Sequence, residues 1–149
     1  MTKLSGVVDM AEQIPEKLLL KLYTPEKKMI EAEVHEVIAP GIEGEFGVLP
    51  GHIPFITALK IGELTFRTGQ KVARLAVAWG YAEVLPEQVT ILAETAELAS
   101  QIDVERAIRA KERAEAQLRR LSPEEKEYAQ ALVSLQRAIN RIQIASKGR

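Results

Sequence analysis

Gly44-Glu45-Phe46-Gly47-Val48-Leu49-Pro50-Gly51-His52-Ile53-Pro54 is the stretch from which the fold of this chain is best argued. Its three glycines and two prolines exclude a helix, because proline has no N–H to donate and glycine loses much conformational entropy on ordering. Apolar residues alternate with these glycines and prolines, which argues against a solvated linker. We interpret the stretch as a strand that enters a buried corner, where glycine supplies positive φ and proline fixes the exit direction.

A phosphate-binding loop is the alternative explanation for these glycines. A P-loop requires Gly-Lys-Ser/Thr at the start of a helix. Here Gly51 is followed by His52, and Pro54 prevents a helix from starting there. The structural interpretation is therefore favoured over the phosphate loop.

Composition excludes several classes of function. The 149 residues suit one compact domain, or a small domain with an appendage. The chain has no cysteine, which removes disulfides, zinc-thiolate sites and thiol nucleophiles. Its two histidines, His35 and His52, lack the HExxH spacing, so no metal site is expected. We expect a structural hydrogen bond from His52 rather than base catalysis, and an exposed or interface position for His35.

Hydropathy and charge divide the chain. No apolar run approaches the length of a membrane span, and residues 1–16 are too polar for a signal peptide. Residues 1–16 show no apolar periodicity and end at Ile14-Pro15, so we expect a mobile leader there. Residues 1–102 carry 9 basic and 14 acidic side chains, whereas residues 103–149 carry 11 and 7. The basic second part should prefer an acidic partner surface, although a solvated helical face would look the same.

Short apolar segments separated by glycine and proline predict a β domain over residues 17–99. About eight to ten strands at this spacing indicate a sandwich or barrel, and no helical period lies between them to build parallel βαβ units. We place Trp79 and Tyr81 in the core or at an interface. The expected strands are residues 17–23, 29–34, 36–39, 53–59, 61–67, 72–78, 79–84 and 89–92, together with the strand expected within residues 44–54.

After Ala93 the apolar period lengthens to between three and four, which predicts helices over residues 100–149. Asp103 can cap a first helix that runs to Leu121. Ser122-Pro123-Glu124-Glu125 has the pattern of a capping box at the head of a second helix. That helix carries one apolar stripe, formed by Tyr128, Leu132, Leu135, Ile139 and Ile142.

The predicted fold class is therefore α+β: an N-terminal antiparallel β-sandwich or barrel followed by a C-terminal antiparallel two-helix hairpin. Three of the seven apolar positions that the first helix offers to its seam are alanines, so docking buries little apolar area. Its residues favour helix without tertiary support. The hairpin can therefore leave the sandwich and stay helical, as a bistable arm.

Residues 45–54, Glu-Phe-Gly-Val-Leu-Pro-Gly-His-x-Pro, resemble the hallmark of the epsilon subunit of bacterial F-type ATP synthases. The resemblance extends over about residues 17–146 and includes the late Ala138-x-Asn140-Arg141 segment. It implies a non-catalytic rotor subunit of the central stalk that couples proton translocation to ATP synthesis. The implied partners are the gamma subunit, the proteolipid c-ring and, through the basic helices, the catalytic alpha/beta subunits, whose ATP hydrolysis the helices inhibit. The implied location is peripheral, on the cytoplasmic face of the bacterial inner membrane, without membrane insertion or nucleic acid.

A second resemblance concerns nucleotide. Ile102-Asp103-Val104-Glu105-Arg106-Ala107 resembles the Ile/Leu-Asp-x-x-Arg-Ala motif of bacterial epsilon subunits, which implies ATP as a regulatory ligand and no required cofactor. Arg137 and Arg141 are i and i+4, as two guanidinium groups on one phosphate would need. A helix cap and solvated arginines explain the same residues. The implied ATP site comprises Glu97, Asp103, Arg106, Arg113, Arg137 and Arg141.

Two other functions compete with the stalk subunit. A free-standing nucleotide-binding sensor module would use the same arginines without joining a complex. A β-sandwich hydrolase is disfavoured, because the sequence contains no nucleophile elbow and no triad.

Overall fold

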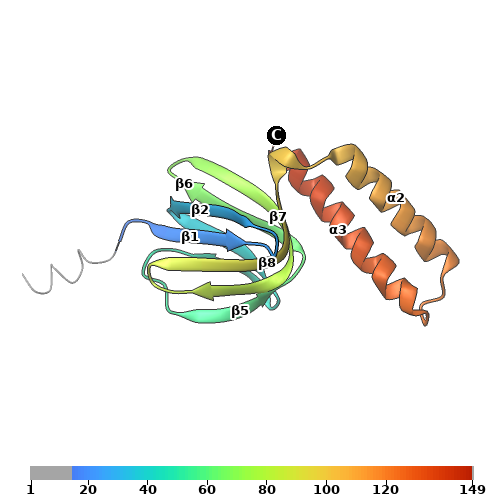
Figure 1. Cartoon of the computed structure of the whole chain (residues 1–149), viewed down its shortest axis with the longest axis horizontal. Helices are drawn as coiled ribbons and strands as arrows, with labels where there is room; N and C mark the ends of the chain where they lie inside the picture. The colour runs from blue at the N-terminus through green and yellow to red at the C-terminus, as the bar shows by residue number, and fades with distance from the viewer. Residues whose placement is uncertain (1–14, 149) are drawn as a thin grey trace, which may run out of the picture.

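The computed structural model describes residues 15–148 and confirms the α+β class, with a β-sandwich followed by a helical hairpin (Figure 1). The predicted leader over residues 1–16 lies almost wholly outside the described residues. The elements in chain order are β1 (Leu18–Tyr23), β2 (Lys28–Val34), β3 (Glu36–Gly41), β4 (Gly44–Val48), β5 (Phe55–Leu59), β6 (Gly62–Thr68), β7 (Lys71–Val84), β8 (Gln88–Leu98), η1 (Ala99–Gln101), α2 (Val104–Arg120) and α3 (Lys126–Gly148).

The strands form a single sheet that folds over on itself. Its order is β2-β1-β8-β7-β5-β3-β4. β6 lies outside this order and pairs with both β3 and β7. The pairs are antiparallel except β1 with β8, which run parallel from Leu19 beside Gln88 to Tyr23 beside Leu92. The predicted antiparallel β-sandwich is confirmed apart from this parallel pair, in which the first and last strands meet after the rest of the sandwich has intervened in the chain.

One apolar core fills the sandwich. The alternation predicted for the first strand is confirmed: Leu18, Leu20 and Leu22 are buried, whereas the residues between them are half-buried. Every strand contributes to this core or packs against it, and none of its residues comes from α2 or α3. The sandwich therefore has its own source of hydrophobic stabilisation.

β7 is one continuous strand, although two strands divided at Trp79 were expected. Residues 71–77 pair with β6 and residues 80–84 pair with β5, so the strand changes partner at the predicted break. Trp79 and Gly80 both have positive φ, at 57° and 124°. A Cβ on Gly80 would lie 1.9 Å from the Leu92 carbonyl oxygen, so only glycine allows β8 to approach this bend.

The hallmark stretch is only partly the buried corner that was expected. β4 ends at the buried Val48, but Leu49 and Ile53 are 53% and 78% exposed. Gly51 has a φ of 85°, and its N–H donates to the Pro86 carbonyl at 2.8 Å. The turn is thus pinned to the β7–β8 turn through its backbone, because strand residues already fill the interior and leave its apolar side chains outside.

The transition to helix occurs later than the period predicted. Residues 95–98 continue β8, because they pair with residues 75–78 of β7. Asp103 does cap α2, and its Oδ1 accepts from the Arg106 N–H at 3.1 Å.

The capping box forms by half, and α3 begins only at Lys126. The Glu125 carboxylate accepts from the Ser122 N–H at 2.7 Å, which is the expected reciprocal bond. The Ser122 hydroxyl donates instead to the Glu124 carboxylate. That bond, followed by a backbone hydrogen bond, lowers the pKa of Glu124. Residues 122–125 therefore form a turn rather than the first turn of the helix.

The hairpin seam is built from alanines on both helices. Ala107 and Ala114 of α2 and Ala131 and Ala138 of α3 are buried. The stripe predicted for α3 lies beside this seam: Leu132 is exposed and the others are half-buried. Close alanine contacts bury little area, as the sequence indicated. Within residues 15–148, neither helix combines the length and apolarity needed to cross a membrane.

Candidate binding cleft between the sandwich and the hairpin

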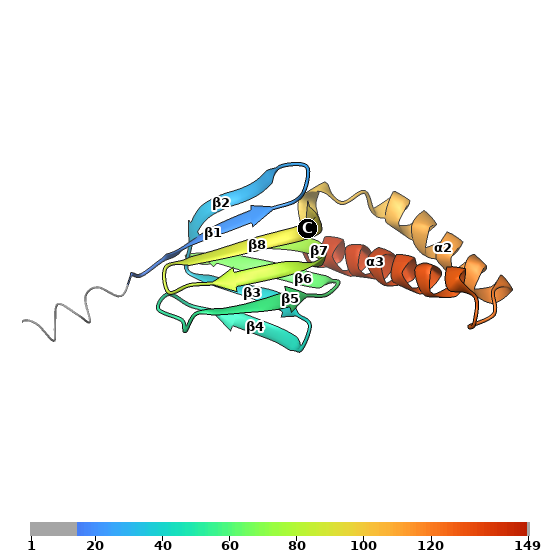
Figure 2. The ribbon, with the colours of Figure 1, turned by 60° about the horizontal axis from the view of Figure 1, so that its bottom comes forward.

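The hairpin is docked on one end of the sandwich through the base of α3. Figure 2 shows the two helices leading away from this end, with the chain reversal of the hairpin farthest from the strands. A small apolar cluster makes the contact, which we call the docking base: Ala76, Ala99, Ile102, Ile144 and Ala145. Among residues 15–148, the apolar contact that holds the hairpin therefore lies at its base.

A cleft of about 720 Å³ lies between the hairpin and the sandwich. Its walls come from the β1–β2 turn, from β7 and β8, and from the facing sides of α2 and α3. The structure brings four of the six residues proposed for the ATP site to this cleft: Glu97, Arg106, Arg137 and Arg141.

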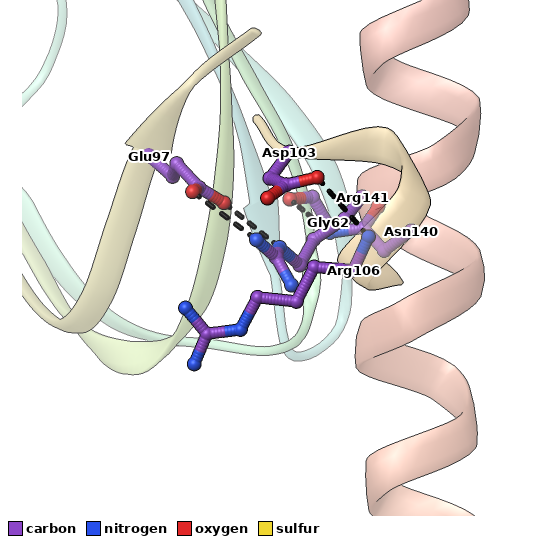
Figure 3. Close-up of polar contacts among 6 residues, drawn as sticks. All are labelled: Gly62, Glu97, Asp103, Arg106, Asn140 and Arg141. Atoms are coloured by element: carbon purple, nitrogen blue, oxygen red, sulfur yellow. Dashed lines mark hydrogen bonds and ion pairs between the residues drawn. The ribbon is translucent and has the colours of Figure 1, made fainter. Parts of the chain in front are cut away.

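Arg141 and Glu97 form a two-point ion pair across the cleft. Arg141 Nε lies 2.8 Å from Glu97 Oε1, and Nη2 lies 3.2 Å from Oε2 (Figure 3). The side chains are 24% and 33% exposed. The planar guanidinium of arginine binds a carboxylate and a phosphate with the same two-point geometry. Glu97 therefore engages a guanidinium group that could otherwise bind an anion.

Arg106 and Arg137 also line the cleft, and neither forms an ion pair within residues 15–148. Figure 3 shows the Arg106 side chain extended from α2 toward the sandwich, on the same side as the Arg141–Glu97 pair. Uncommitted guanidinium groups on both helices can bind a multiply charged anion through charge-assisted hydrogen bonds.

The other two proposed residues do not reach the cleft. Asp103 is the N-cap of α2, where its carboxylate is used by the Arg106 N–H. Arg113 is exposed on α2 and does not line the cleft. In this structure Asp103 therefore acts as the helix cap, which was the alternative explanation of the motif.

Sequence reasoning missed the polar contacts that hold the base of α3. Asn140 Nδ2 donates to the Gly62 carbonyl at 3.0 Å (Figure 3), and Lys147 Nζ lies 3.6 Å from Glu63. Glu63 also pairs with Arg74 of β7 at 3.1 Å. In the sequence, Asn140 stands out only as part of the Ala138-x-Asn140-Arg141 segment, and nothing around Glu63 distinguishes it from a solvated strand residue.

Two exposed apolar surfaces lie on the sandwich. The first, which we call the outer patch, spreads over neighbouring strands around a hollow of about 580 Å³. Tyr81 and Leu92 are directly paired on β7 and β8, and both are exposed. Its large apolar side chains are Ile42, Ile56, Trp79, Tyr81 and Leu92.

The second surface, which we call the apolar tip, consists of Leu49, Ile53 and Leu85. It lies on the β4–β5 and β7–β8 turns, which the Gly51–Pro86 hydrogen bond joins. Figure 2 shows these turns at the end of the sandwich away from the helices. Contiguous exposed apolar surface of this kind marks contact sites.

The histidines have structural partners. His52 Nδ1 is 2.8 Å from the Ile53 carbonyl, and its ring packs near Phe55. His35 Nδ1 accepts from the Gly69 N–H at 2.8 Å. No group of three or more metal-ligating side chains converges within residues 15–148. The fold and the cleft thus define a class of protein: a β-sandwich carrying a docked helical hairpin, with a charged cleft between the two and exposed apolar surfaces on the sandwich.

The chain belongs to the ATP synthase delta/epsilon chain family. The sequence model of the ATP synthase Delta/Epsilon chain β-sandwich domain matches residues 17–99, and that of the long α-helix domain matches residues 100–146. The ATP synthase epsilon chain of Geobacter sulfurreducens is 53% identical over 132 residues, which are 89% of this chain and 96% of that protein. The corresponding protein of Geobacter metallireducens is 54% identical with the same coverage. By this relationship the protein is a non-catalytic subunit of the synthase.

Solved structures agree. A chain of the Euglena gracilis mitochondrial ATP synthase, in a structure of its OSCP, F1 and c-ring, superposes with a TM-score of 0.77 at 27% identity. The match covers 91% of this chain and 84% of that one. A chain from the central stalk and c-ring of Tetrahymena thermophila mitochondrial ATP synthase matches with a TM-score of 0.51 at 15% identity, which shows the fold alone.

Proposed function

We propose that the protein is a rotor subunit of the central stalk of a bacterial F-type ATP synthase. In this role it couples proton translocation to ATP synthesis and inhibits ATP hydrolysis through its C-terminal helices. The observation that carries the proposal is the arrangement of three surfaces: the outer patch, the apolar tip opposite the hairpin, and a basic hairpin docked through its base. Each suits a different partner.

The outer patch is the proposed contact with the gamma subunit. Tyr81 and Ile56, at 61% and 71% exposed, leave more apolar area in water than an isolated side chain would. Aromatic residues at the centre of such a patch are typical of stable interfaces.

The apolar tip is the proposed contact with the proteolipid c-ring. Its side chains project from two turns that the Gly51–Pro86 hydrogen bond joins, so they form one surface. A subunit that contacts the c-ring at one end and presents the hairpin at the other would connect the ring with the catalytic alpha/beta subunits. The proposed location is therefore peripheral, on the cytoplasmic face of the inner membrane.

The hairpin is the proposed inhibitory element. Its excess of basic side chains suits an acidic surface on the alpha/beta subunits, and its tip carries Arg119 and Arg120 in the last turn of α2. Undocking breaks a small apolar cluster and a few polar contacts, and the helices keep their alanine seam. The hairpin can thus leave the sandwich as an intact helical unit.

ATP is the proposed regulatory ligand of the docked state. The cleft exists only while the hairpin lies on the sandwich, because its walls come from both. A ligand that binds one state stabilises that state by linkage, so ATP would favour the docked, non-inhibitory hairpin. A free-standing nucleotide-binding sensor module is the second candidate, and it rests on the same cleft.

Deleting residues 103–149 from the gene for the chain tests the proposal. The assembled synthase should hydrolyse ATP faster than the wild type, while tagged chain of either length co-purifies with gamma. Unchanged hydrolysis would remove the inhibitory role. Failure of the wild-type chain to co-purify with the synthase would favour the sensor module.

A further inference from the structure

The β1–β2 turn supplies a wall of the cleft that the arginine motif does not include. Thr24, Glu26 and Lys27 line the cleft from the sandwich side, opposite the helices. The turn is short and internally bonded: the Thr24 N–H donates to the Lys27 carbonyl at 2.9 Å, and the Lys27 N–H donates to Thr24 Oγ1 at 3.3 Å. These bonds fix the shape of the turn that carries Lys27, and its ammonium forms no ion pair within residues 15–148.

Some charged groups of the cleft already form an ion pair with each other, and others have no ion-pair partner within residues 15–148. Four cations line it, from Lys27, Arg106, Arg137 and Arg141, together with three carboxylates, from Glu26, Glu94 and Glu97. Arg141 and Glu97 neutralise each other. The ion pairs found within residues 15–148 include none of the other five groups.

We propose that Lys27 is an anion-binding residue of this cleft, which contacts the phosphates of a bound nucleotide from the sandwich side. The proposal rests on the nucleotide-binding function proposed above. Arg106 and Arg137 face the anion from the helices, and the ammonium of Lys27 provides positive charge on the opposite wall. A flexible lysine suits this place, because it acts as a point charge and follows the phosphates without the fixed geometry of a guanidinium.

The carboxylates beside Lys27 restrict the ligand. Glu26 and Glu94 repel a bare polyphosphate, but they accept hydrogen bonds from amino and hydroxyl groups. A nucleotide offers both an anionic chain and such donors on its base and ribose. We therefore expect a nucleoside triphosphate to bind more tightly than inorganic tripolyphosphate.

With Lys27 on the sandwich, binding of the ligand depends on the hairpin being docked. A ligand that contacts Lys27 on one wall and Arg106 or Arg137 on the other joins the sandwich to the hairpin. When the hairpin leaves, the sandwich retains only one of these three cations, and the helices retain two. Removing Lys27 should therefore weaken both binding and the stabilisation of the docked hairpin by ATP.

The neighbouring Lys28 provides a matched control. It does not line the cleft, and it pairs with Glu31 at 3.4 Å. Titrations of the full-length chain with ATP, tripolyphosphate and adenosine are followed by calorimetry or NMR for the wild type and for Lys27→Ala, Lys27→Glu, Lys28→Ala and Lys28→Glu. Each pair of variants changes the net charge equally, so the long-range field is matched.

Lys27→Ala should raise the Kd for ATP about two- to fivefold, the range expected for an exposed charge contact, and Lys27→Glu should raise it about tenfold. The Lys28 variants should stay within about twofold of the wild type, and adenosine affinity should not distinguish the two positions. Equal effects at the two positions, with ATP still bound, would overturn the role of Lys27 and leave the nucleotide site standing. No binding of ATP by the wild type at millimolar concentration would overturn both.

Discussion

Arg141 of α3 and Glu97 of β8 join the hairpin to the sandwich by two parallel contacts, at 2.8 and 3.2 Å. The residues lie 44 positions apart in the chain, one on a strand and one near the end of the last helix. The pair has two consequences. It fastens the docked hairpin, and it withholds one guanidinium from any anion that enters the cleft.

Replacing Arg141 with alanine should loosen the docked hairpin. The change leaves the partly buried Glu97 carboxylate without its partner, at a cost of about 1 kcal/mol for a pair of this exposure. Amide hydrogen exchange in α3 should accelerate, and exchange in the sandwich core should not. Arg141→Lys should restore the protection only in part, because lysine lacks the planar fork.

Arg109→Ala is the matched control for that experiment. Arg109 is exposed on α2 and forms no ion pair within the described residues. If it accelerates exchange as much as Arg141→Ala does, the ion pair is not what holds the hairpin.

Gly80→Ala should destabilise the sandwich by about 2 kcal/mol or more. The new Cβ would collide with the Leu92 carbonyl, and the residue would have to keep a φ of 124°. Urea unfolding of the purified chain measures the change. Gly69→Ala serves for comparison, since Gly69 also has positive φ but open space around it, and a loss there equal to that at Gly80 would deny the close approach of β8.

Residues 1–99 should fold without the hairpin. The apolar core of the sandwich includes no residue of α2 or α3, so removing them exposes only the docking base. The truncated protein should show a single cooperative urea transition and should still bind gamma. A gradual, non-cooperative loss of structure would contradict this.

Replacing Arg119 and Arg120 together by alanine should release part of the inhibition of ATP hydrolysis. Both side chains are exposed in the last turn of α2, where they can reach an acidic surface once the hairpin is released. The rate of hydrolysis by the assembled synthase should rise, and more so at low salt, because salt screens exposed charge pairs. An increase of the same size at high salt would argue against a charge contact.

Ile53→Asp should lower ATP synthesis driven by a proton gradient without destabilising the subunit. Ile53 is 78% exposed at the apolar tip, so its loss removes contact area but no core packing. Reconstituted vesicles measure synthesis, and urea unfolding checks stability. Val72→Asp places the same charge at another exposed apolar position, and an equal loss of synthesis there would deny a specific role for the tip.

The sequence predicted which segments form strands and helices better than it predicted where these elements begin and end. Alternation in Leu18, Leu20 and Leu22 indicated a strand with one buried face, and that face is buried. The change of period after Ala93 misplaced the end of β8, because pairing with β7 extends the strand through Leu98 regardless of local pattern. The second helix begins late for a local reason, since the Ser122 hydroxyl donates to the Glu124 carboxylate instead of capping the helix.

The sequence likewise predicted some residues of the candidate site and not others. The spacing of Arg137 and Arg141 places both on one helical face, and both line the cleft. The motif could not separate Arg106, which lines the cleft, from Asp103, which caps the helix, because the spacing is compatible with either role. Lys27 and Glu63 carried no signal at all, since each acquires its neighbours from segments far away in the chain.

By itself the sequence determined the family, the order of strands and helices, the thin alanine seam and the absence of cysteine chemistry. These properties depend on local pattern and residue type, which act over a few positions of the chain. Only the tertiary structure decided that Leu49 and Ile53 of the hallmark stretch face outward, that Glu97 engages Arg141, and that the β1–β2 turn forms a wall of the cleft. Those relationships arise from docking between distant segments, whose relative positions no local pattern specifies.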